Sequence, residues 1–149
     1  MAIYTRQTIP EQVRSGIMDP EIKAWLKTGP VLGAHEPIHV QRAAHDAFID
    51  ADKPPIGRVE FLGLDGPHGT IPVRCYHPSK PGAAEGAALV YLHGGGYIVG
   101  SLDQFDTAMR LFAENSGAQV YAVDYKLAPE YQFPVQIAEA EFVVRWLID

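Results

Sequence analysis

Apolar residues recur at helical spacing through the first part of the chain, from residue 10 to about residue 51. The positions that form two successive apolar stripes are Ile17, Ile22, Trp25 and Leu26, and then Val40, Ala43, Ala44, Ala47 and Phe48. Prolines at positions 20, 30 and 37 interrupt this stretch. The pattern therefore predicts several short helices that cap the molecule or pack as an outer layer.

After residue 53 the pattern changes to short extended runs. Residues 58–64 and 71–76 are separated by the turn-forming cluster 65–69, so they predict an antiparallel hairpin. In the first of these strands the expected buried side chains are those of Val59, Phe61 and Leu64. A polar loop containing glycine, proline and serine follows the hairpin.

The remainder alternates strand and helix. Residues 87–92 form a continuous apolar run, which is typical of a strand covered on both faces. A helix is predicted over 103–115, with Gly117 as its C-cap, then a strand over 119–125 and a helix over 134–148. The apolar positions expected on these two helices are Phe105, Ala108, Met109, Leu111 and Phe112, and then Ile137, Ala138, Phe142, Val144 and Leu147. The order predicts an α/β protein that opens a doubly wound, mostly parallel sheet.

Length and charge narrow the possible functions. With 149 residues the chain can form one domain, but α/β domains often reach about 200–250 residues, so we expect the sheet to be incomplete. The formal net charge is −6, and the twelve lysines and arginines are scattered. Nucleic-acid binding is therefore not expected.

Cellular location is inferred from what the sequence lacks. Cys75 is the single cysteine, which excludes an internal disulfide and gives no zinc or redox motif. The N-terminus has no apolar segment of signal-peptide length, and no run approaches the roughly 18 apolar residues of a membrane span. We expect a soluble, cytoplasmic protein.

The strongest chemical signal is the glycine triplet at residues 94–96, which follows the buried strand 87–92 and precedes a helix. Glycines in such a loop expose backbone N–H groups that side chains would otherwise shield. Preorganised N–H donors stabilise the oxyanion that develops during acyl transfer. The surrounding sequence, His-Gly-Gly-Gly directly after the third strand, is the oxyanion-loop pattern of lipases and esterases.

Two motifs in this order resemble the hormone-sensitive-lipase-like esterases of the α/β-hydrolase fold. Residues 91–103 are similar to the HGGG loop of that family, and residues 124–130 are similar to its D-Y-R-L-A-P-E segment, with Lys126 in place of arginine. Residues 133–135 then match the start of the next helix. The resemblance extends from Val59 to the end of the chain, and the helical N-terminus is similar to the family's cap.

This resemblance assigns expected roles to the residues of the first motif. Gly94 and Gly95 are the expected backbone donors of the oxyanion hole, and Gly96 makes room for the turn. His93 is expected to orient the loop through hydrogen bonds, since the family's catalytic base lies near the C-terminus. Tyr97 either borders the acyl pocket or has a packing role.

Asp124 and Glu130, in the second motif, are expected to support the loop through ion pairs or helix caps. Paired acid and base catalysis is the less favoured interpretation of these two carboxylates. The resemblance implies no metal or organic cofactor.

The catalytic serine is the large departure from the family. Hydrolases of this fold carry it in G-x-S-x-G, followed in the chain by an acid and a histidine. The serines here are Ser15, Ser79, Ser101 and Ser116, and none has that setting. We therefore expect the nucleophile, base and acid to be absent from these residues, and a G-D-S-A-G turn to follow Asp149 in the parent sequence. Cys75, in an early strand, is expected to pack rather than react.

The hypothesis is a carboxylic ester hydrolase for short-chain esters that acts through a serine acyl-enzyme in its complete form, while the 149 residues alone are inactive. Residues 1–52 would be a cap segment and residues 53–149 the first half of the hydrolase domain. The strand 87–92 would be left as an exposed edge, through which the short chain self-associates. The alternatives are a non-catalytic module for ligand binding or protein interaction and, less favoured, a nucleotide-binding domain, since neither GxGxxG nor GK[ST] is present.

Overall fold

The computed structural model describes residues 18–28, 36–80, 82 and 86–149. The chain divides into two compact units, Met1–Val31 and Leu32–Asp149. The first contains helix α2 (Pro20–Thr28), whose first turn is capped by the Asp19 carboxylate, which accepts the Glu21 N–H at 2.8 Å. The predicted break at Pro20 is therefore a helix start, where proline is tolerated because its missing N–H would have no partner.

The second unit begins, among the described residues, with α3 (Ile38–His45) and the short 3-10 helix η1 (Asp46–Phe48). Helix α3 starts directly after Pro37, as the sequence predicts. Its side chains are all exposed or half-buried. Predicted helical residues 10–17 and 29–35 lie outside the described residues.

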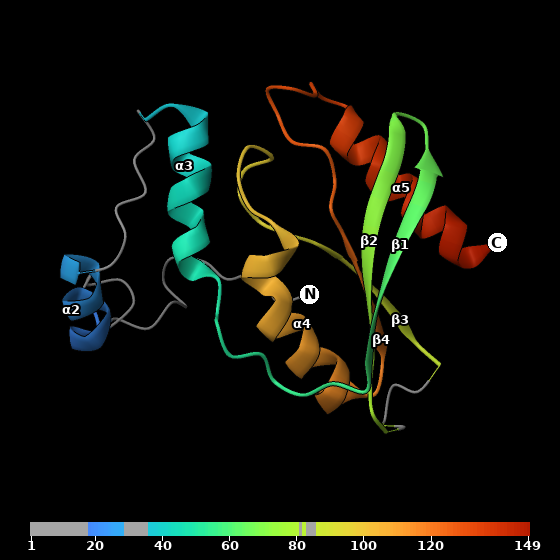
Figure 1. Ribbon diagram of the computed structural model, residues 1–149, viewed down its shortest axis with the longest axis horizontal. Helices are drawn as coiled ribbons and strands as arrows, with labels where there is room; N and C mark the ends of the chain where they lie inside the picture. Colours follow the sequence, from blue (N-terminus) through green and yellow to red (C-terminus); the bar gives the residue numbers. More distant parts are fainter. Residues whose placement is uncertain (1–17, 29–35, 81, 83–85) are drawn as a thin grey trace, which may run out of the picture. The chain divides into compact units, whose positions relative to one another are not determined.

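Four strands form one sheet in the order β1-β2-β4-β3 (Figure 1). Strands β1 (Arg58–Gly66) and β2 (Gly69–His77) are the antiparallel hairpin. Strand β4 (Gln119–Val123) pairs antiparallel with β2 and parallel with β3 (Ala88–Leu92). The positions of the predicted strands are confirmed, although the hairpin turn is tighter than expected, because both strands extend into the 65–69 cluster. The expected coverage of β3 on both faces was wrong for the described residues, since its side chains are exposed or half-buried.

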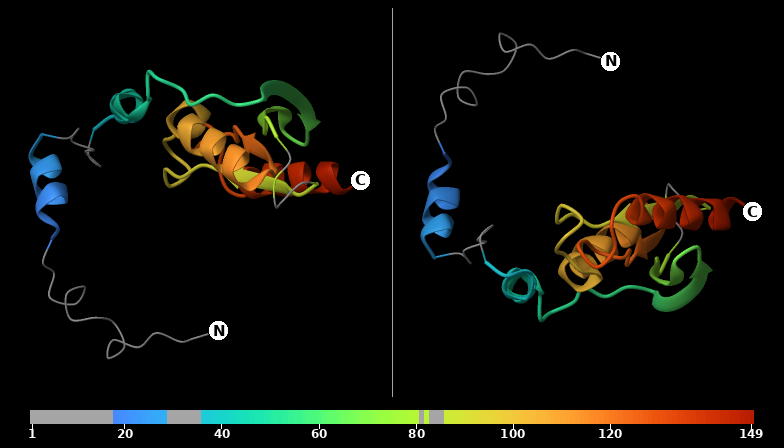
Figure 2. Two further views of the ribbon diagram at one scale, coloured as in Figure 1. Left: turned by 90° about the horizontal axis from the view of Figure 1, so that it is seen from below. Right: turned by 90° about the horizontal axis from the view of Figure 1, so that it is seen from above.

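The two long helices cover opposite faces of the sheet (Figure 2). Helix α4 (Leu102–Ser116) connects β3 to β4 and packs on one face, where Tyr76 and Val120 are fully buried. Helix α5 (Val135–Ile148) packs on the other face over a second cluster that includes Val73 and Val123. Gly117 ends α4 with a φ of 78° and donates its N–H to the Ala113 carbonyl at 2.8 Å, which confirms the predicted C-cap.

The prediction for the buried face of β1 was wrong at Phe61. Its side chain is 73% exposed and lies against the Arg74 guanidinium, 5.2 Å from the ring centre. Leu64 is buried as expected, and Leu62 packs beside it in the α5-side cluster. Alternate side chains of a strand point to opposite faces, so Val59 and Phe61 share the α4 side, where only Val59 joins the core.

The buried faces of α4 and α5 also differ from the predicted apolar stripes. Leu111 and Phe112 are about half exposed, and so are Ile137 and Val144. The buried residues are instead Leu102, Asp106, Met109 and Ala113 on α4, and Gln136, Glu139 and Val143 on α5. Each helix thus turns polar side chains into the protein, which an apolar stripe cannot reveal.

Cys75 belongs to the core. Its side chain is 1% exposed, and burial raises the pKa of the thiol to about 11. The thiol therefore stays protonated and unreactive at neutral pH, in agreement with the expected packing role.

Strand β3 forms one edge of the sheet that the described residues build. It pairs with β4 along its whole length, and its other side has no strand partner among the described residues. In the same part of the chain, no helix is long and apolar enough to cross a membrane.

Candidate active site

The loops that follow the two parallel strands lie at the same end of the sheet (Figure 1). The first runs from His93 to Ser101, between β3 and α4. The second runs from Asp124 to Pro134, between β4 and α5. Ligand sites of open α/β sheets are commonly built at the carboxyl ends of the strands. The sequence-predicted site residues all lie on these two loops.

The first loop turns sharply because of its glycines. Gly95 has a φ of 133°, and its carbonyl accepts the N–H groups of Ile98 and Val99, both at 3.1 Å. A Cβ at Gly95 would collide with the Val99 carbonyl, and one at Gly100 would collide with the Gly94 carbonyl and the His93 ring. Glycine is therefore required at both ends of this turn.

The turn leaves backbone donors free. Among the hydrogen bonds of the described residues, none uses the N–H of Gly94 or Gly95 as donor. Gly94 is exposed and Gly95 is half-buried, so these donors are accessible, and backbone donors without a protein partner become useful where they face a ligand. These are the two groups that the sequence predicts for an oxyanion hole.

His93 and Tyr125 hold the base of the loop. The His93 side chain is buried, and its Nδ1 lies 3.0 Å from the Gly94 carbonyl, to which it donates in the matching tautomer. The Tyr125 hydroxyl donates to the His93 carbonyl at 2.6 Å, and the two rings stack with their centres 4.3 Å apart. Burial raises the pKa of Tyr125, which keeps this donor protonated.

A cavity of about 260 Å³ opens beside these residues. Its walls include the backbone of residues 93–97, the Tyr125 side chain and two residues from the start of α5, Gln136 and Ile137. Tyr97 is half exposed at this cavity and meets the Tyr125 ring edge to face, with 6.0 Å between the ring centres. With a φ of 63°, Tyr97 is the one non-glycine residue with positive φ in the described part of the chain.

The second loop is fastened to α5 through Lys126, the residue that replaces the family's arginine. Its Nζ lies 2.6 Å from Glu139 Oε1, and its backbone N–H donates to Oε2 at 2.9 Å. Glu139 is fully buried. Gln136 adds hydrogen bonds from its amide to the carbonyls of Lys126 and Tyr131, at 3.0 and 2.8 Å.

The two carboxylates of the second motif have different surroundings. Glu130 receives both terminal nitrogens of Arg42 at 2.8 Å, and this hydrogen bonding lowers the pKa of Glu130 to about 2. The Asp124 side chain is exposed and makes no hydrogen bond or ion pair among the described residues, while its backbone N–H donates to the Pro72 carbonyl at 2.9 Å. The supporting roles assigned to both residues stay predictions.

Four residues of this region were not predicted as site residues from the sequence: Arg42, Tyr125, Gln136 and Glu139. Tyr125 lies inside the second motif, next to Asp124, and this position was the sequence signal that could have identified it. Glu139 and Gln136 are polar residues on the buried side of a helix, which a search for apolar periodicity passes over. Arg42 is distant in sequence from both loops, and nothing in its local pattern marks it.

None of the described serines has a catalytic setting. Ser79 donates to Glu114 at 2.7 Å and Ser116 to the Phe112 carbonyl at 2.7 Å, while Ser101 Oγ is buried without a partner. Ser15 lies outside the described residues. Within the described ranges, no three histidine, cysteine or acidic side chains are grouped so that they could hold a metal ion.

Comparisons with known proteins show which family the chain is similar to. Residues 89–149 match the model of a family with the α/β-hydrolase fold. An ethyl acetate hydrolase from Pseudomonas putida is 38% identical over 89% of this chain and 46% of its own length. The carboxylic ester hydrolase LipN of Mycobacterium tuberculosis is 35% identical over 87% of this chain and 36% of its own.

The solved structures give the same result. An esterase from Pyrobaculum calidifontis superposes with a TM-score of 0.77 and 30% sequence identity, over 88% of this chain and 43% of that one. The chain thus spans less than half the length of each of these three relatives.

Loss of the Glu139 carboxylate tests how firmly the second loop is held. In Glu139→Ala, the Lys126 ammonium, whose side chain is 14% exposed, loses its carboxylate partner and, of its hydrogen bonds among the described residues, keeps only the one to the Thr70 carbonyl. Removing one member of a buried ion pair costs about 3–5 kcal/mol, so we expect a loss of this size in the free energy of unfolding, measured with urea. Glu141→Ala is the matched control, because it breaks the exposed pair with Arg145 and costs at most about 0.5 kcal/mol. Equal losses in the two variants would contradict the assignment.

Proposed function

Because this chain belongs to the α/β-hydrolase-fold family, we propose that it carries the oxyanion hole of a serine carboxylic ester hydrolase. The observation that carries the proposal is the loop after β3, where the N–H groups of Gly94 and Gly95 have no acceptor among the described residues and the two glycines line a cavity. The esterase names of the relatives supply the reaction class.

In the proposed reaction a serine hydroxyl attacks the ester carbonyl and loses its proton to a histidine base. The carbonyl oxygen becomes an oxyanion, to which Gly94 and Gly95 donate. Collapse of this intermediate expels the alcohol and leaves an acyl-enzyme, which water then hydrolyses. Serine, base and acid come from outside these 149 residues, since no serine of the chain stands in G-x-S-x-G.

The proposed substrates are short-chain carboxylic esters. Support comes from the Pseudomonas putida relative, which is named for ethyl acetate. Tyr97 borders the cavity that the two glycines line and would contact the acyl chain. The proposed supports of the loops are His93, Gly96, Asp124 and Glu130. The hydrogen bonds of His93 to Gly94 and of Glu130 to Arg42 support this role for those two residues.

The remaining proposals concern organisation and location. Residues 1–52 are the cap segment and residues 53–149 the first half of the hydrolase domain. The proposed location is the cytoplasm, and the single cysteine, which is free and buried, supports it.

Substitution of Gly95 tests the oxyanion hole. In Gly95→Val the Cβ would overlap the Val99 carbonyl at a φ that valine does not adopt, so the loop must rearrange. In a form of the enzyme that carries its nucleophile, we expect kcat for p-nitrophenyl acetate to fall by roughly 10²–10³-fold or more, which is typical of losing one oxyanion donor. Gly86→Val is the control, because Gly86 also has a positive φ, while a Cβ there meets no atom. A folded Gly95→Val protein with wild-type kcat would exclude this assignment.

The 149-residue chain alone is expected to be inactive, because an oxyanion hole without a nucleophile retains only the residual part of catalysis. We expect neither a burst nor turnover with p-nitrophenyl acetate or butyrate above background. Incubation with a fluorophosphonate probe, followed by intact-mass measurement, should give no adduct. Stoichiometric labelling of one of the four serines would refute the proposal that the nucleophile lies elsewhere.

The free edge of β3 is proposed to drive self-association of the 149-residue chain. Strand edges with unpaired N–H and C=O groups recruit further strands, and β3 is apolar along its length. Sedimentation velocity is expected to show oligomers whose share grows with concentration. Replacing Val90 by proline removes one backbone N–H donor from β3, so the association should decrease. A stable monomer with cooperative unfolding would be the contrary result.

A further inference from the structure

Arg42, on α3, contacts both loops of the candidate active site. Its Nε donates to the Ile98 carbonyl at 2.9 Å, in the first loop. Its Nη2 donates to the Ala128 carbonyl at 3.0 Å, in the second loop, and its two terminal nitrogens both reach Glu130 at 2.8 Å. One side chain therefore joins three segments that are far apart in sequence.

Arg42 binds carbonyls that lie next to the backbone hydrogen bond between the two loops. The Ala128 N–H donates to the Tyr97 carbonyl at 2.8 Å, and Arg42 binds the next carbonyl along the first loop, that of Ile98. On the other loop it binds the carbonyl of Ala128 itself. The planar guanidinium can bridge these acceptors because its donors are fixed in a fork, which a lysine ammonium cannot reproduce.

One further hydrogen bond connects these contacts to the turn that presents the proposed oxyanion donors. The N–H of Ile98, whose carbonyl Arg42 binds, donates to the Gly95 carbonyl at 3.1 Å. The peptide that carries the Gly95 carbonyl is thus two hydrogen bonds away from the guanidinium. Because the turn at Gly95 has a conformation that most residues avoid, it depends on such support from its neighbours.

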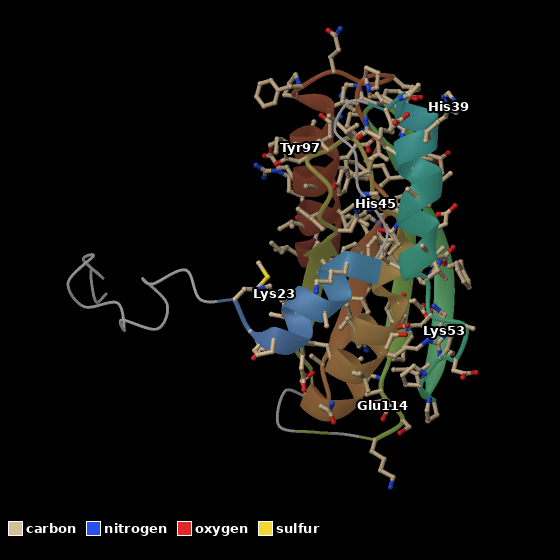
Figure 3. All side chains as sticks on the ribbon, turned by 90° about the vertical axis from the view of Figure 1, so that its left-hand side faces the viewer. Lys23, His39, His45, Lys53, Tyr97 and Glu114 are labelled. Carbon is tan, nitrogen blue, oxygen red and sulfur yellow. The ribbon has the colours of Figure 1, made fainter. Side chains whose placement is uncertain are left out.

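Packing of α3 offers little alternative support. None of its side chains is buried, and a cavity of about 430 Å³ is lined by residues of α3 and by Gly100, Ser101 and Gln104. Figure 3 shows α3 with His39 toward one end and His45 further along it. The described polar contacts between α3 and the two loops all come from Arg42.

We propose that Arg42 is a positioning residue that locks the two loops together and thereby holds the Gly95 turn in its donor conformation. The expected effect of Arg42 on catalysis rests on the proposed function. Its expected effect on the positions of the two loops rests on the structure alone. Arg42 is not among the residues that line the cavity beside Gly94 and Gly95; it acts through the carbonyls of Ile98 and Ala128.

Hydrogen–deuterium exchange of the 149-residue chain tests the mechanical part. In Arg42→Ala we expect the amides of Ile98, Val99 and Ala128 to exchange about tenfold faster or more, since several charge-assisted hydrogen bonds are lost. Arg42→Lys should behave similarly, because an ammonium can pair with Glu130 without bridging both carbonyls. Glu130→Gln should have a smaller effect, because both carbonyl contacts remain.

Two comparisons separate positioning from general stability. Arg145→Ala removes an exposed arginine that pairs only with Glu141, and it should leave the loop amides unchanged. Amides inside α4 should exchange at the wild-type rate in every variant. Unchanged loop amides in Arg42→Ala, or faster exchange throughout the chain, would each overturn the proposal.

Kinetics in a nucleophile-bearing form test the catalytic part. Arg42→Ala should lower kcat more than it changes KM, and it should weaken binding of a trifluoromethyl ketone, which forms the tetrahedral oxyanion. Methylguanidinium should restore part of kcat in Arg42→Ala and none in Gly95→Val. A change in KM alone would overturn the catalytic role. Wild-type protein that hydrolyses no ester would instead refute the proposed function, while the exchange result still decides the mechanical role of Arg42.

Discussion

The organising constraint of this structure is the need to keep the N–H groups of Gly94 and Gly95 without a protein acceptor at the end of β3. Gly94 is exposed and Gly95 is half-buried, so only the conformation of the loop keeps these donors from turning toward an acceptor of the protein itself. The turn at Gly95 commits its carbonyl to Ile98 and Val99, and no hydrogen bond among the described residues uses the N–H of Gly94 or Gly95 as donor. A side chain at Gly95 would collide with the Val99 carbonyl, so the turn depends on glycine at this position.

The structure supplies the support that this turn cannot provide for itself. At one end, Tyr125 fixes the His93 carbonyl and stacks on its ring. At the other end, the Tyr97 carbonyl is hydrogen-bonded to Ala128, and Arg42 binds the carbonyl beside it. The second loop, which provides Tyr125 and Ala128, therefore serves as the frame of the first. This arrangement explains why the two motifs occur together in one sequence.

Features that depend on local patterns could be predicted from the sequence. The strands, the helix that ends at Gly117 and the loop containing Gly95 are marked by apolar runs and glycines, and the structure confirms these elements. Features that depend on partners distant in sequence could not. Phe61 is exposed beside Arg74, although its apolar side chain suggested burial. Arg42 has no local signal at all, because its role arises from the meeting of α3 with two loops.

Buried carboxylates on α4 and α5 anchor neighbouring segments of the chain. On the α4 side, burial opposes ionisation of Asp106, but hydrogen bonds from Arg110, Tyr76 and Arg74 hold the pKa of its carboxyl below the usual value. On the α5 side, Glu139 binds both the side chain and the backbone of Lys126. Buried ion pairs contribute little net stability compared with apolar packing of the same volume.

Such a pair instead constrains geometry, because a carboxylate forms good hydrogen bonds only with donors that lie at the right positions around its oxygens. Glu139 accepts the backbone N–H of Lys126 and so fixes the main chain at that residue. The residue before it, Tyr125, donates its hydroxyl to the His93 carbonyl, so the fixed main chain also positions this support of the first loop. An apolar residue at position 139 could fill the space, but it could not select one position of that N–H. The polar interior of α5 is therefore better explained by the geometry of the loops than by the stability of the helix.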